Sequence, residues 1–383
     1  MVKAKEANLR SRMERDATDC AAAKMLKREP CHNGDDDCAV CNDGAAVLHV
    51  GHSHAHASTP PPLGKWSYTA DVARAFPQGA EELKRATVIV TGANGGIGRE
   101  TAKALATIGA RVVLACRNLA KAGVAKTYIL NSSKLGESGR VVCMELDLAS
   151  PQSIKAFVAR FTKQSQEERW DPLSTLVCNA GITALGGLRV NEEGTESTFA
   201  TNHLGHCLLV KLLLPVLKQY APLARVVVVG SNSHFGPLAT KDMLNKEAIM
   251  TKVVRPEKRD FSPMKAYGSS KLFNTLFACA LHRQYASDGV VACSLHPGSM
   301  IASDIGRESW IANFYLKYIN SWFAKSVDQG ASTTVMCCLM PASELKGQYF
   351  NDCAVFAPSP LAQDENVQSF AWALTDELLR AHL

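Results

Sequence analysis

Short apolar runs alternate with longer amphipathic segments from about residue 85 to the C-terminus. The runs are rich in β-branched residues and bounded by turn residues, a pattern typical of buried strands. They predict six strands, near 85–91, 111–117, 140–146, 174–179, 225–230 and 290–296. Helical periodicity between them predicts an α/β fold, a doubly wound parallel sheet. Right-handed crossovers then give the strand order 3-2-1-4-5-6, with the ligand at the carboxyl ends of the strands.

A glycine-rich turn follows the first predicted strand and precedes a helical segment at 99–106. Its glycines, Gly92, Gly96 and Gly98, allow the backbone to approach a pyrophosphate, and the helix N-terminus offers unpaired N–H groups to that anion. Ordinary loops have similar turns, but the position between strand and helix favours dinucleotide binding. We assign Asn94 and Ile97 to the same cofactor-binding turn.

The end of the second predicted strand bears on the choice of cofactor. It reads Ala115-Cys116-Arg117 and has no carboxylate to accept hydrogen bonds from a ribose diol. Arg117 can pair with a ribose 2′-phosphate, and Arg99 adds positive charge nearby. The sequence therefore favours NADP over NAD, the alternative being a surface arginine at a strand end.

Tyr267 and Lys271 are the candidate acid–base pair. Four residues apart on a helix, they share one face, so an ammonium can lie beside a phenol and favour its ionised form. The same spacing is common on solvated helix faces, and it becomes informative because it follows the glycine turn.

Further motifs stand in chain order around this pair. With the glycine turn they resemble the short-chain dehydrogenase/reductase family, and the runs 115–118, 202–206 and 295–298 are similar to its retinol-dehydrogenase-like branch. The matching positions are Asp147, Asn179-Ala180-Gly181, Asn202, Ser231, Tyr267, Lys271 and Pro297-Gly298. The resemblance begins near residue 84 and implies one Rossmann-like domain, residues 84–383, with a seventh strand near 347–350.

The resemblance also implies roles for these residues. Tyr267 would give a proton to a carbonyl oxygen during hydride transfer, and Lys271 would lower the pKa of Tyr267 and hold the nicotinamide ribose. Ser231 would orient the substrate oxygen, with Ser233 as its local competitor. Asn202, in a helix near 192–220, would hold a water that links Lys271 to solvent.

Most of these positions also have a structural interpretation. Asp147 would contact the adenine or cap a helix. Asn179 would either tie the neighbouring strands and the cofactor together or have a purely structural role between the strands. Ser231 would serve as a strand-end cap, and Asn202 as a buried amide. Ala180, Gly181, Pro297 and Gly298 complete the predicted cofactor site, which contains no metal.

An aromatic segment, residues 299–325, follows Pro297-Gly298. It covers a bulky apolar substrate such as a steroid, retinoid or long-chain carbonyl compound, or it packs a helical subdomain. The sequence leaves both interpretations open. Its six rings belong to Trp310, Phe314, Tyr315, Tyr318, Trp322 and Phe323.

Residues 1–83 are predicted to be a disordered, low-complexity extension. They contain one Cys-x-x-Cys pair, Cys38 and Cys41, and no second ligand pair at standard spacing, so disorder is favoured over a zinc module. The other metal-ligating residue types in this stretch are Cys31, His32, His52, His54 and His56.

Composition narrows the class of protein. The first thirty residues hold eight Lys and Arg and five Asp and Glu, a net charge of +3. Of the total net charge of +6, only +3 is left for the other 353 residues, which are nearly neutral, and this argues against a nucleic-acid partner. Thirteen cysteines without disulfide spacing suit a reducing compartment, and no apolar run reaches the ~18 residues of a transmembrane segment. We expect a soluble, cytoplasmic enzyme.

Two functions follow. The first is an NADP-dependent oxidoreductase that interconverts an apolar carbonyl compound and its alcohol. The second is a cofactor-binding regulatory protein whose N-terminal tail binds unknown partners. The helices near 192–220 and 265–287 are surfaces on which members of the family dimerise, which predicts a homodimer.

Overall fold

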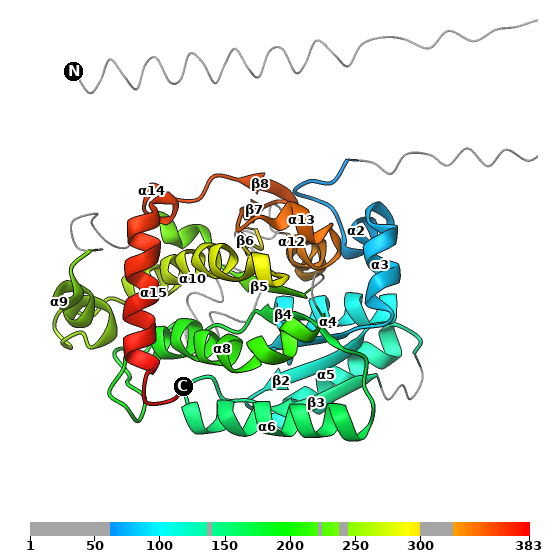
Figure 1. Ribbon diagram of the computed structural model, residues 1–383, viewed down its shortest axis with the longest axis horizontal. Helices are drawn as coiled ribbons and strands as arrows, with labels where there is room; N and C mark the ends of the chain where they lie inside the picture. The colour runs from blue at the N-terminus through cyan, green and yellow to red at the C-terminus, as the bar shows by residue number, and fades with distance from the viewer. Residues whose placement is uncertain (1–61, 136–139, 221–223, 237–243, 299–324) are drawn as a thin grey trace, which may run out of the picture. The chain divides into compact units, whose positions relative to one another are not determined.

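An eight-stranded sheet forms the centre of the fold, in the order β3-β2-β1-β4-β5-β6-β7-β8 (Figure 1). The computed structural model describes residues 62–135, 140–220, 224–236, 244–298 and 325–383. The strands are β1 (Thr87–Thr91), β2 (Arg111–Cys116), β3 (Val141–Glu145), β4 (Leu173–Cys178), β5 (Ala224–Val229), β6 (Val290–His296), β7 (Tyr349–Asn351) and β8 (Ala354–Phe356).

This sheet confirms the predicted α/β class and strand order. The first seven strands pair in parallel, and the predicted seventh strand extends the sheet beside β6. Strand β8, which the sequence did not predict, pairs antiparallel with β7. It is three residues long and follows a tight turn in which Asp352 and Cys353 have positive φ angles, so it offers too little periodicity to detect.

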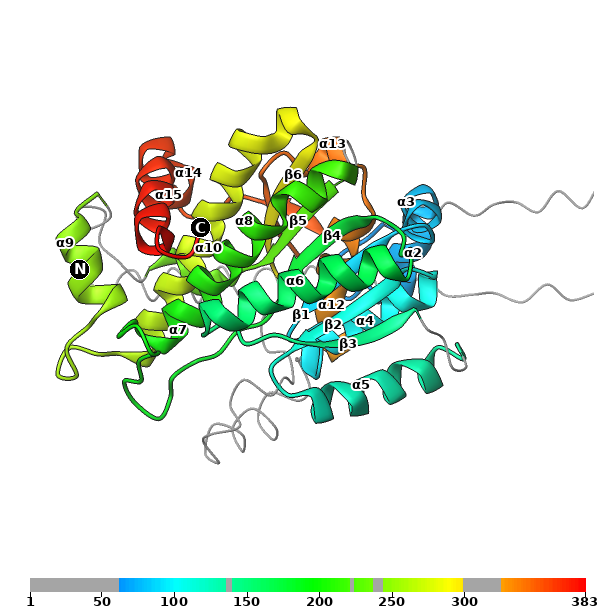
Figure 2. The ribbon, with the colours of Figure 1, turned by 60° about the horizontal axis from the view of Figure 1, so that its bottom comes forward.

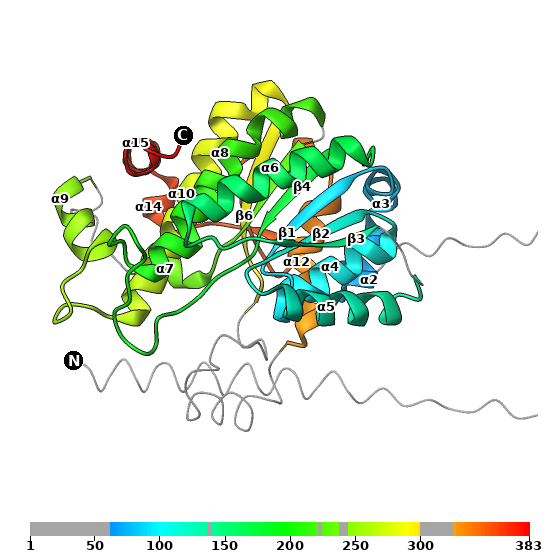
Figure 3. The same ribbon diagram turned by 90° about the horizontal axis from the view of Figure 1, so that it is seen from below.

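Helices cover both faces of the sheet (Figures 2 and 3). Val88 and Val90 of β1 face the core that contains α4, α5 and α12, whereas Ile89 faces the core that contains α6, α8 and α10. Burial on both faces explains why the central strands are almost continuously apolar. The longer helices are α4 (Gly96–Ile108), α5 (Leu119–Ser132), α6 (Pro151–Glu167), α8 (Gly205–Leu217), α10 (Pro263–Tyr285), α12 (Val327–Leu339) and α15 (Glu365–Leu379).

Shorter helices complete the fold. They are α2 (Thr69–Ala75), α3 (Pro77–Leu83), α7 (Ser197–Phe199), α9 (Lys246–Ile249), α13 (Ala342–Leu345) and α14 (Pro360–Gln363). Turns of π-helix span Ala200–Leu204 and Met250–Val254, and 3₁₀ turns span Lys218–Tyr220, Asn232–Phe235 and Ala286–Asp288.

The predicted helix near 192–220 begins later than expected. Helix α7 starts at Ser197 because the carboxylate of Glu196 accepts hydrogen bonds from the backbone N–H groups of Thr198 and Phe199, both at 2.8 Å. The π-helical turn then interrupts the helix at Asn202 before α8 continues it. The predicted helix near 265–287 corresponds to α10.

The predicted domain boundary at residue 84 is wrong. Residues 62–83 belong to the folded unit, where α2 and α3 pack against α12 and bury Val72 and Leu83. Two seven-residue helices are too short for periodicity to reveal them. The remainder of the predicted extension, with its cysteines and histidines, lies outside the described residues.

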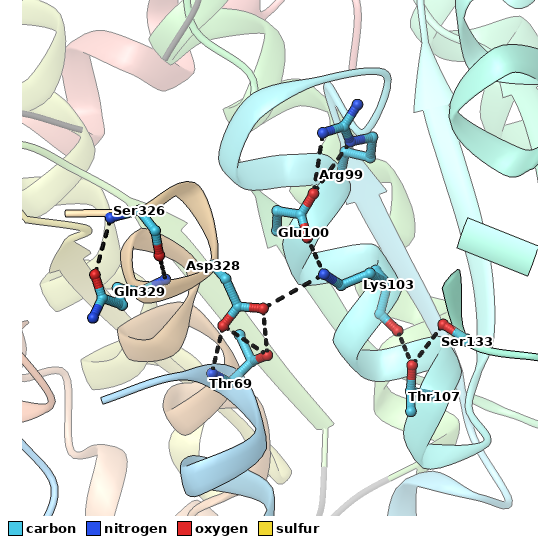
Figure 4. A network of polar contacts seen from close by, with 9 residues as sticks. All are labelled: Thr69, Arg99, Glu100, Lys103, Thr107, Ser133, Ser326, Asp328 and Gln329. Atoms are coloured by element: carbon cyan, nitrogen blue, oxygen red, sulfur yellow. Dashed lines mark hydrogen bonds and ion pairs between the residues drawn. The ribbon is translucent and has the colours of Figure 1, made fainter. Parts of the chain in front are cut away.

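A polar network fixes α2 to its neighbours (Figure 4). The backbone N–H and hydroxyl of Thr69 donate to the carboxylate of Asp328 on α12, at 2.9 Å and 3.1 Å. Lys103 of α4 pairs with the same carboxylate at 3.5 Å and with Glu100. The segment before the first strand is therefore joined to the helix that follows the glycine turn.

In the described part of the chain, one helical stretch, Ser197–Tyr220, is long and apolar enough to cross a membrane. Within its most apolar window, 78% of the residues are buried inside the fold. A core helix of a globular domain has the same properties.

The contact between α3 and α12 predicts the effect of one substitution. A Cβ at Gly79 would lie 1.8 Å from the carbonyl oxygen of Leu339, so Gly79→Ala should lower the free energy of unfolding by about 1–3 kcal/mol in urea denaturation. Gly123→Ala in α5 is the control, because its Cβ meets nothing within 4 Å and alanine favours a helix by ~0.5–1 kcal/mol. Equal stability of the two variants would contradict the packing of α3.

Candidate active site

A cleft of about 630 Å³ lies at the carboxyl ends of the strands. Residues that directly follow β1, β2, β4, β5 and β6 contribute to its walls, as the strand order requires. All predicted cofactor-binding residues except Gly298 line the cleft: Gly92, Asn94, Gly96, Ile97, Gly98, Arg117, Asp147, Asn179, Ala180, Gly181, Tyr267, Lys271 and Pro297.

The glycine turn forms a close-packed cradle at one end of the cleft. Gly92 and Gly96 have φ angles of 66° and 53°, which glycine adopts without strain. A Cβ at Gly98 would lie 2.4 Å from Nδ2 of Asn179 and 2.6 Å from the carbonyl oxygen of Gly92. The cradle opens onto the N-terminus of α4, so its N–H groups and dipole suit a phosphate.

Thr91, the last residue of β1, joins this cradle to β4. Its hydroxyl accepts hydrogen bonds from the backbone N–H groups of Asn179 at 2.9 Å and Ala180 at 3.0 Å. The side chain of Asn179 donates to the carbonyl oxygen of Thr91 at 2.8 Å. Asn179 therefore ties the two strands together and also lines the cleft.

Positive charge gathers where β2 ends. Arg117 and Lys121 both line the cleft there, and the side chain of Asn118 accepts a hydrogen bond from the backbone N–H of Lys121 at 2.9 Å. Lys121 was not predicted, although two features of the sequence mark it: the Asn118 cap and its position in the first turn of α5. Cys116 is neutral in this wall, because burial raises the pKa of its thiol to about 12.

Arg99 does not line the cleft. Its guanidinium pairs with Glu100 at 3.1 Å and lies 4.0 Å from the ring centroid of Tyr128. It is not among the cleft-lining residues, since it projects from α4 beyond the glycine turn. The expectation that Arg99 assists the cofactor is therefore not supported by its position.

Asp147 lines the cleft beside the end of β3. Its carboxylate accepts a hydrogen bond from the backbone N–H of Ala149 at 3.0 Å, which stabilises the turn. It does not cap α6, because the N-cap is Ser150. One carboxylate oxygen of Asp147 is used in this hydrogen bond, and the side chain also lines the cleft.

Tyr267 and Lys271 reach the cleft from α10, as their spacing predicts. The Lys271 ammonium nitrogen lies 5.6 Å from the ring centroid of Tyr267 and donates to the carbonyl oxygen of Val229 at 2.7 Å. Burial lowers the pKa of Lys271 to about 8. Burial raises the pKa of Tyr267, and a hydrogen bond with Ser231 opposes that rise. In the structure the pKa of Tyr267 therefore lies above its ordinary value, and the lowering expected from Lys271 together with an oxidised nicotinamide stays a prediction for the cofactor complex.

Ser231 follows β5 and has two functions in the local structure. Its hydroxyl accepts a hydrogen bond from the backbone N–H of Ser233 at 3.1 Å and so caps the 3₁₀ turn. The same hydroxyl donates a hydrogen bond to the Ser233 hydroxyl at 3.2 Å, and an interaction with Ser231 lowers the pKa of Tyr267. The role of Ser231 as the partner of the tyrosine stays a prediction.

Asn202 lies behind the cleft wall, held by hydrogen bonds to two residues. Its side-chain oxygen accepts from the backbone N–H of Ile182 at 2.8 Å, and its nitrogen donates to the Ile182 carbonyl and to the Ser270 hydroxyl, both at 3.0 Å. These contacts agree with a buried structural amide. The predicted water-holding role stays a prediction.

The turn after β6 packs against a buried ion pair. Gly298 has a φ angle of 115°, and a Cβ there would lie 2.7–2.9 Å from the side chain of Lys325. Lys325, fully buried, pairs with Asp352 at 2.5 Å. This pair has no local sequence signature, because its members come from distant segments. The aromatic residues predicted to cover the substrate, 310–323, lie outside the described residues.

Comparison with known proteins agrees with this geometry. The family model for short chain dehydrogenase matches residues 86–242. The WW domain-containing oxidoreductase of Homo sapiens is 43% identical over 298 residues, which cover 77% of this chain and 68% of that protein. The chain belongs to the short-chain dehydrogenase/reductase family.

Retinol dehydrogenase 12 of Mus musculus is another relative in this family, 37% identical over 294 residues that cover 76% of this chain and 85% of that protein. Both relatives confirm the predicted branch. The Pseudomonas aeruginosa RhlG/NADP complex shares the fold, with a TM-score of 0.53 and 19% identity over 70% of this chain and 94% of that one.

The pKa of Lys271 predicts how stability changes with pH. Between pH 8 and about 10.4, the unfolded state keeps the lysine proton that the folded state has lost, so the free energy of unfolding should rise with pH, by up to ~3 kcal/mol. Lys271→Met should remove this contribution.

The measurement is urea unfolding of both proteins at several pH values from 7 to 11. Cysteines ionise in the unfolded state over the same range, and their contribution is common to both proteins apart from that of Cys178, whose thiol interacts with the Lys271 charge. A wild-type minus variant difference that does not change with pH would contradict the lowered pKa.

Proposed function

We propose that this protein is an NADP(H)-dependent oxidoreductase that interconverts an apolar carbonyl compound and its alcohol. The proposal rests on one observation: Tyr267 and Lys271 line the same cleft as the glycine cradle. Family membership supports the reaction class, and the residues of the cleft support the finer assignments.

The cleft fits a dinucleotide in its shape and in its charges. The cradle at Gly92 and Gly98 leaves no room for a Cβ, which suits a backbone that must approach a pyrophosphate closely. Arg117 and Lys121 line the cleft where β2 ends, and their positive charges suit the 2′-phosphate of NADP. When bound, the nicotinamide supplies or accepts the hydride.

The proton chemistry belongs to Tyr267. Its raised pKa keeps the phenol protonated at neutral pH, so it can donate to a carbonyl oxygen that gains negative charge during reduction. Ser231 would donate a hydrogen bond to the same oxygen and hold it toward the phenol. Lys271, positive below about pH 8, would stabilise the phenolate that remains after proton transfer.

An apolar substrate is supported by side chains near these groups. Ile182 lines the cleft and remains 38% exposed, and Phe235 is 47% exposed in the turn that begins at Ser231. Apolar surface beside a proton donor would exclude water from the reacting carbonyl. We also propose a cytoplasmic location, because thirteen cysteines without disulfide spacing suit a reducing compartment.

Removing the Tyr267 hydroxyl should abolish turnover without preventing cofactor binding. For Tyr267→Phe we expect kcat to fall by at least ~100-fold, the usual contribution of a general acid, with the NADPH Kd nearly unchanged. The assay is NADPH oxidation with retinal, ketosteroids and apolar aldehydes. Tyr285→Phe is the matched control, because Tyr285 ends α10 and packs against Trp372. Full activity of Tyr267→Phe, or NADPH binding by the wild type without any turnover, would contradict the proposal, and the second outcome favours a regulatory protein.

The two basic residues should set the choice of cofactor. Arg117→Gln and Lys121→Gln should each raise the KM for NADPH about tenfold, the effect of one lost charge-assisted contact, and leave the KM for NADH unchanged. Arg99→Gln is the control, because Arg99 pairs with Glu100. Preference of the wild type for NADH, or equal losses with both cofactors, would refute the NADP assignment.

A further inference from the structure

Two buried histidines contact the main chain of the proposed catalytic residues. Nδ1 of His206 lies 2.9 Å from the carbonyl oxygen of Asn202, and Nδ1 of His234 lies 2.7 Å from the carbonyl oxygen of Ser231. Both rings are almost completely buried. Each histidine follows the residue that it contacts by three or four positions, so the contact is local in sequence.

The second nitrogen of each ring contacts a distant element. Nε2 of His206 lies 2.9 Å from the hydroxyl of Thr91, at the end of β1. Nε2 of His234 accepts a hydrogen bond from the backbone N–H of Ser359 at 3.0 Å, just before α14. Each ring therefore bridges a proposed catalytic residue to another part of the fold.

These partners define the position of the ring proton. A carbonyl oxygen only accepts and a backbone N–H only donates, so His234 must carry its proton on Nδ1. The same holds for His206, because its Nδ1 also faces a carbonyl. The Thr91 hydroxyl already accepts from Asn179 and Ala180, and its one proton has two acceptors, Nε2 of His206 at 2.9 Å and the carbonyl oxygen of Val177 at 3.3 Å, of which the nearer is the histidine.

Both histidines are suited to remain neutral. Burial lowers the pKa of His206 to about 4, and the Lys271 charge acts in the same direction. Burial also lowers the pKa of His234. A second proton on His234 would point at the N–H of Ser359, with no acceptor there.

We propose that His206 and His234 are positioning residues for the reaction proposed above, on which this inference rests. His206 holds the Asn202 segment at a fixed distance from the cofactor-binding turn through Thr91. His234 holds the turn of Ser231 against the chain at Ser359, and so keeps the Ser231 hydroxyl near Tyr267.

His203 offers a comparison within the same helical turn. It is equally buried, but its ring nitrogens contact the side chains of Asn274 on α10 and Thr375 on α15, at 3.3 Å and 2.9 Å. Neither partner lines the cleft. His203 therefore separates loss of a buried histidine from loss of positioning.

The first experiment measures kcat, the NADPH Kd and the melting temperature of full-length variants. His206→Leu and His234→Leu should lower kcat at least tenfold, about 1.4 kcal/mol in the barrier, with the NADPH Kd changed less than threefold. Asparagine can donate an N–H to the same carbonyl, so His206→Asn and His234→Asn should recover kcat to within about threefold of the wild type. His203→Leu should lower the melting temperature and leave kcat unchanged.

Several outcomes would overturn the proposal. Leucine variants with wild-type kcat, asparagine variants no better than leucine variants, or an equal loss of kcat in His203→Leu would each show that the histidines do not position the site. Failure of the proposed function looks different, because the wild type itself would then show no turnover.

A second measurement does not need turnover. Long-range ¹H–¹⁵N NMR correlations distinguish the two histidine tautomers, and the spectra of His206→Leu and His234→Leu assign the two rings. Both should be neutral Nδ1–H tautomers at pH 7. An Nε2–H tautomer or a protonated ring at either position would overturn the arrangement.

Discussion

The hydroxyl of Thr91 connects the main parts of the site. It closes the turn after β4, bonds to the ring of His206 and sits directly before the first glycine of the cradle. Parallel strands end at the same edge of a sheet, but their loops need a specific contact to keep one geometry. One buried side chain provides that contact between the cofactor-binding turn and the segment that carries Asn202.

The electrostatics of the site follow from burial. Taking Tyr267 and Lys271 out of water disfavours the charged form of both side chains. The pKa of the phenol therefore rises, and the pKa of the lysine ammonium falls. In this state the pair does not resemble a phenolate beside an ammonium. A charge that enters the cleft with a ligand acts in a low-dielectric environment, where it has a larger effect than at the surface.

The sequence predicted the parts of the fold that depend on local pattern. Continuous apolar strands, the glycine turn and the Tyr267–Lys271 spacing each have a signature within a few residues, and the strand order follows from general handedness rules. Lys121 was missed although a local cap marks it. Pairing of Lys325 with Asp352, and of Thr69 with Asp328, joins segments that no local pattern connects.

The tyrosine pKa shows a different limit. Spacing on a helix placed Lys271 beside Tyr267, but only the fold reveals that the phenol is buried and that this burial raises its pKa. In the same way, the amide of Asn202 was identified from the family pattern, whereas its three hydrogen-bond partners come from Ile182 and Ser270.

The contact between Gly298 and Lys325 has a consequence for the edge of the sheet. The side chain of Lys325 lies against Gly298 and pairs with Asp352. Gly298 follows β6 and Asp352 directly follows β7, so one lysine side chain joins the carboxyl ends of these two neighbouring strands. The chain beyond β6 is therefore fixed to the strand that extends the sheet, and the turn that borders the cleft at Pro297 is held in place from outside the cleft.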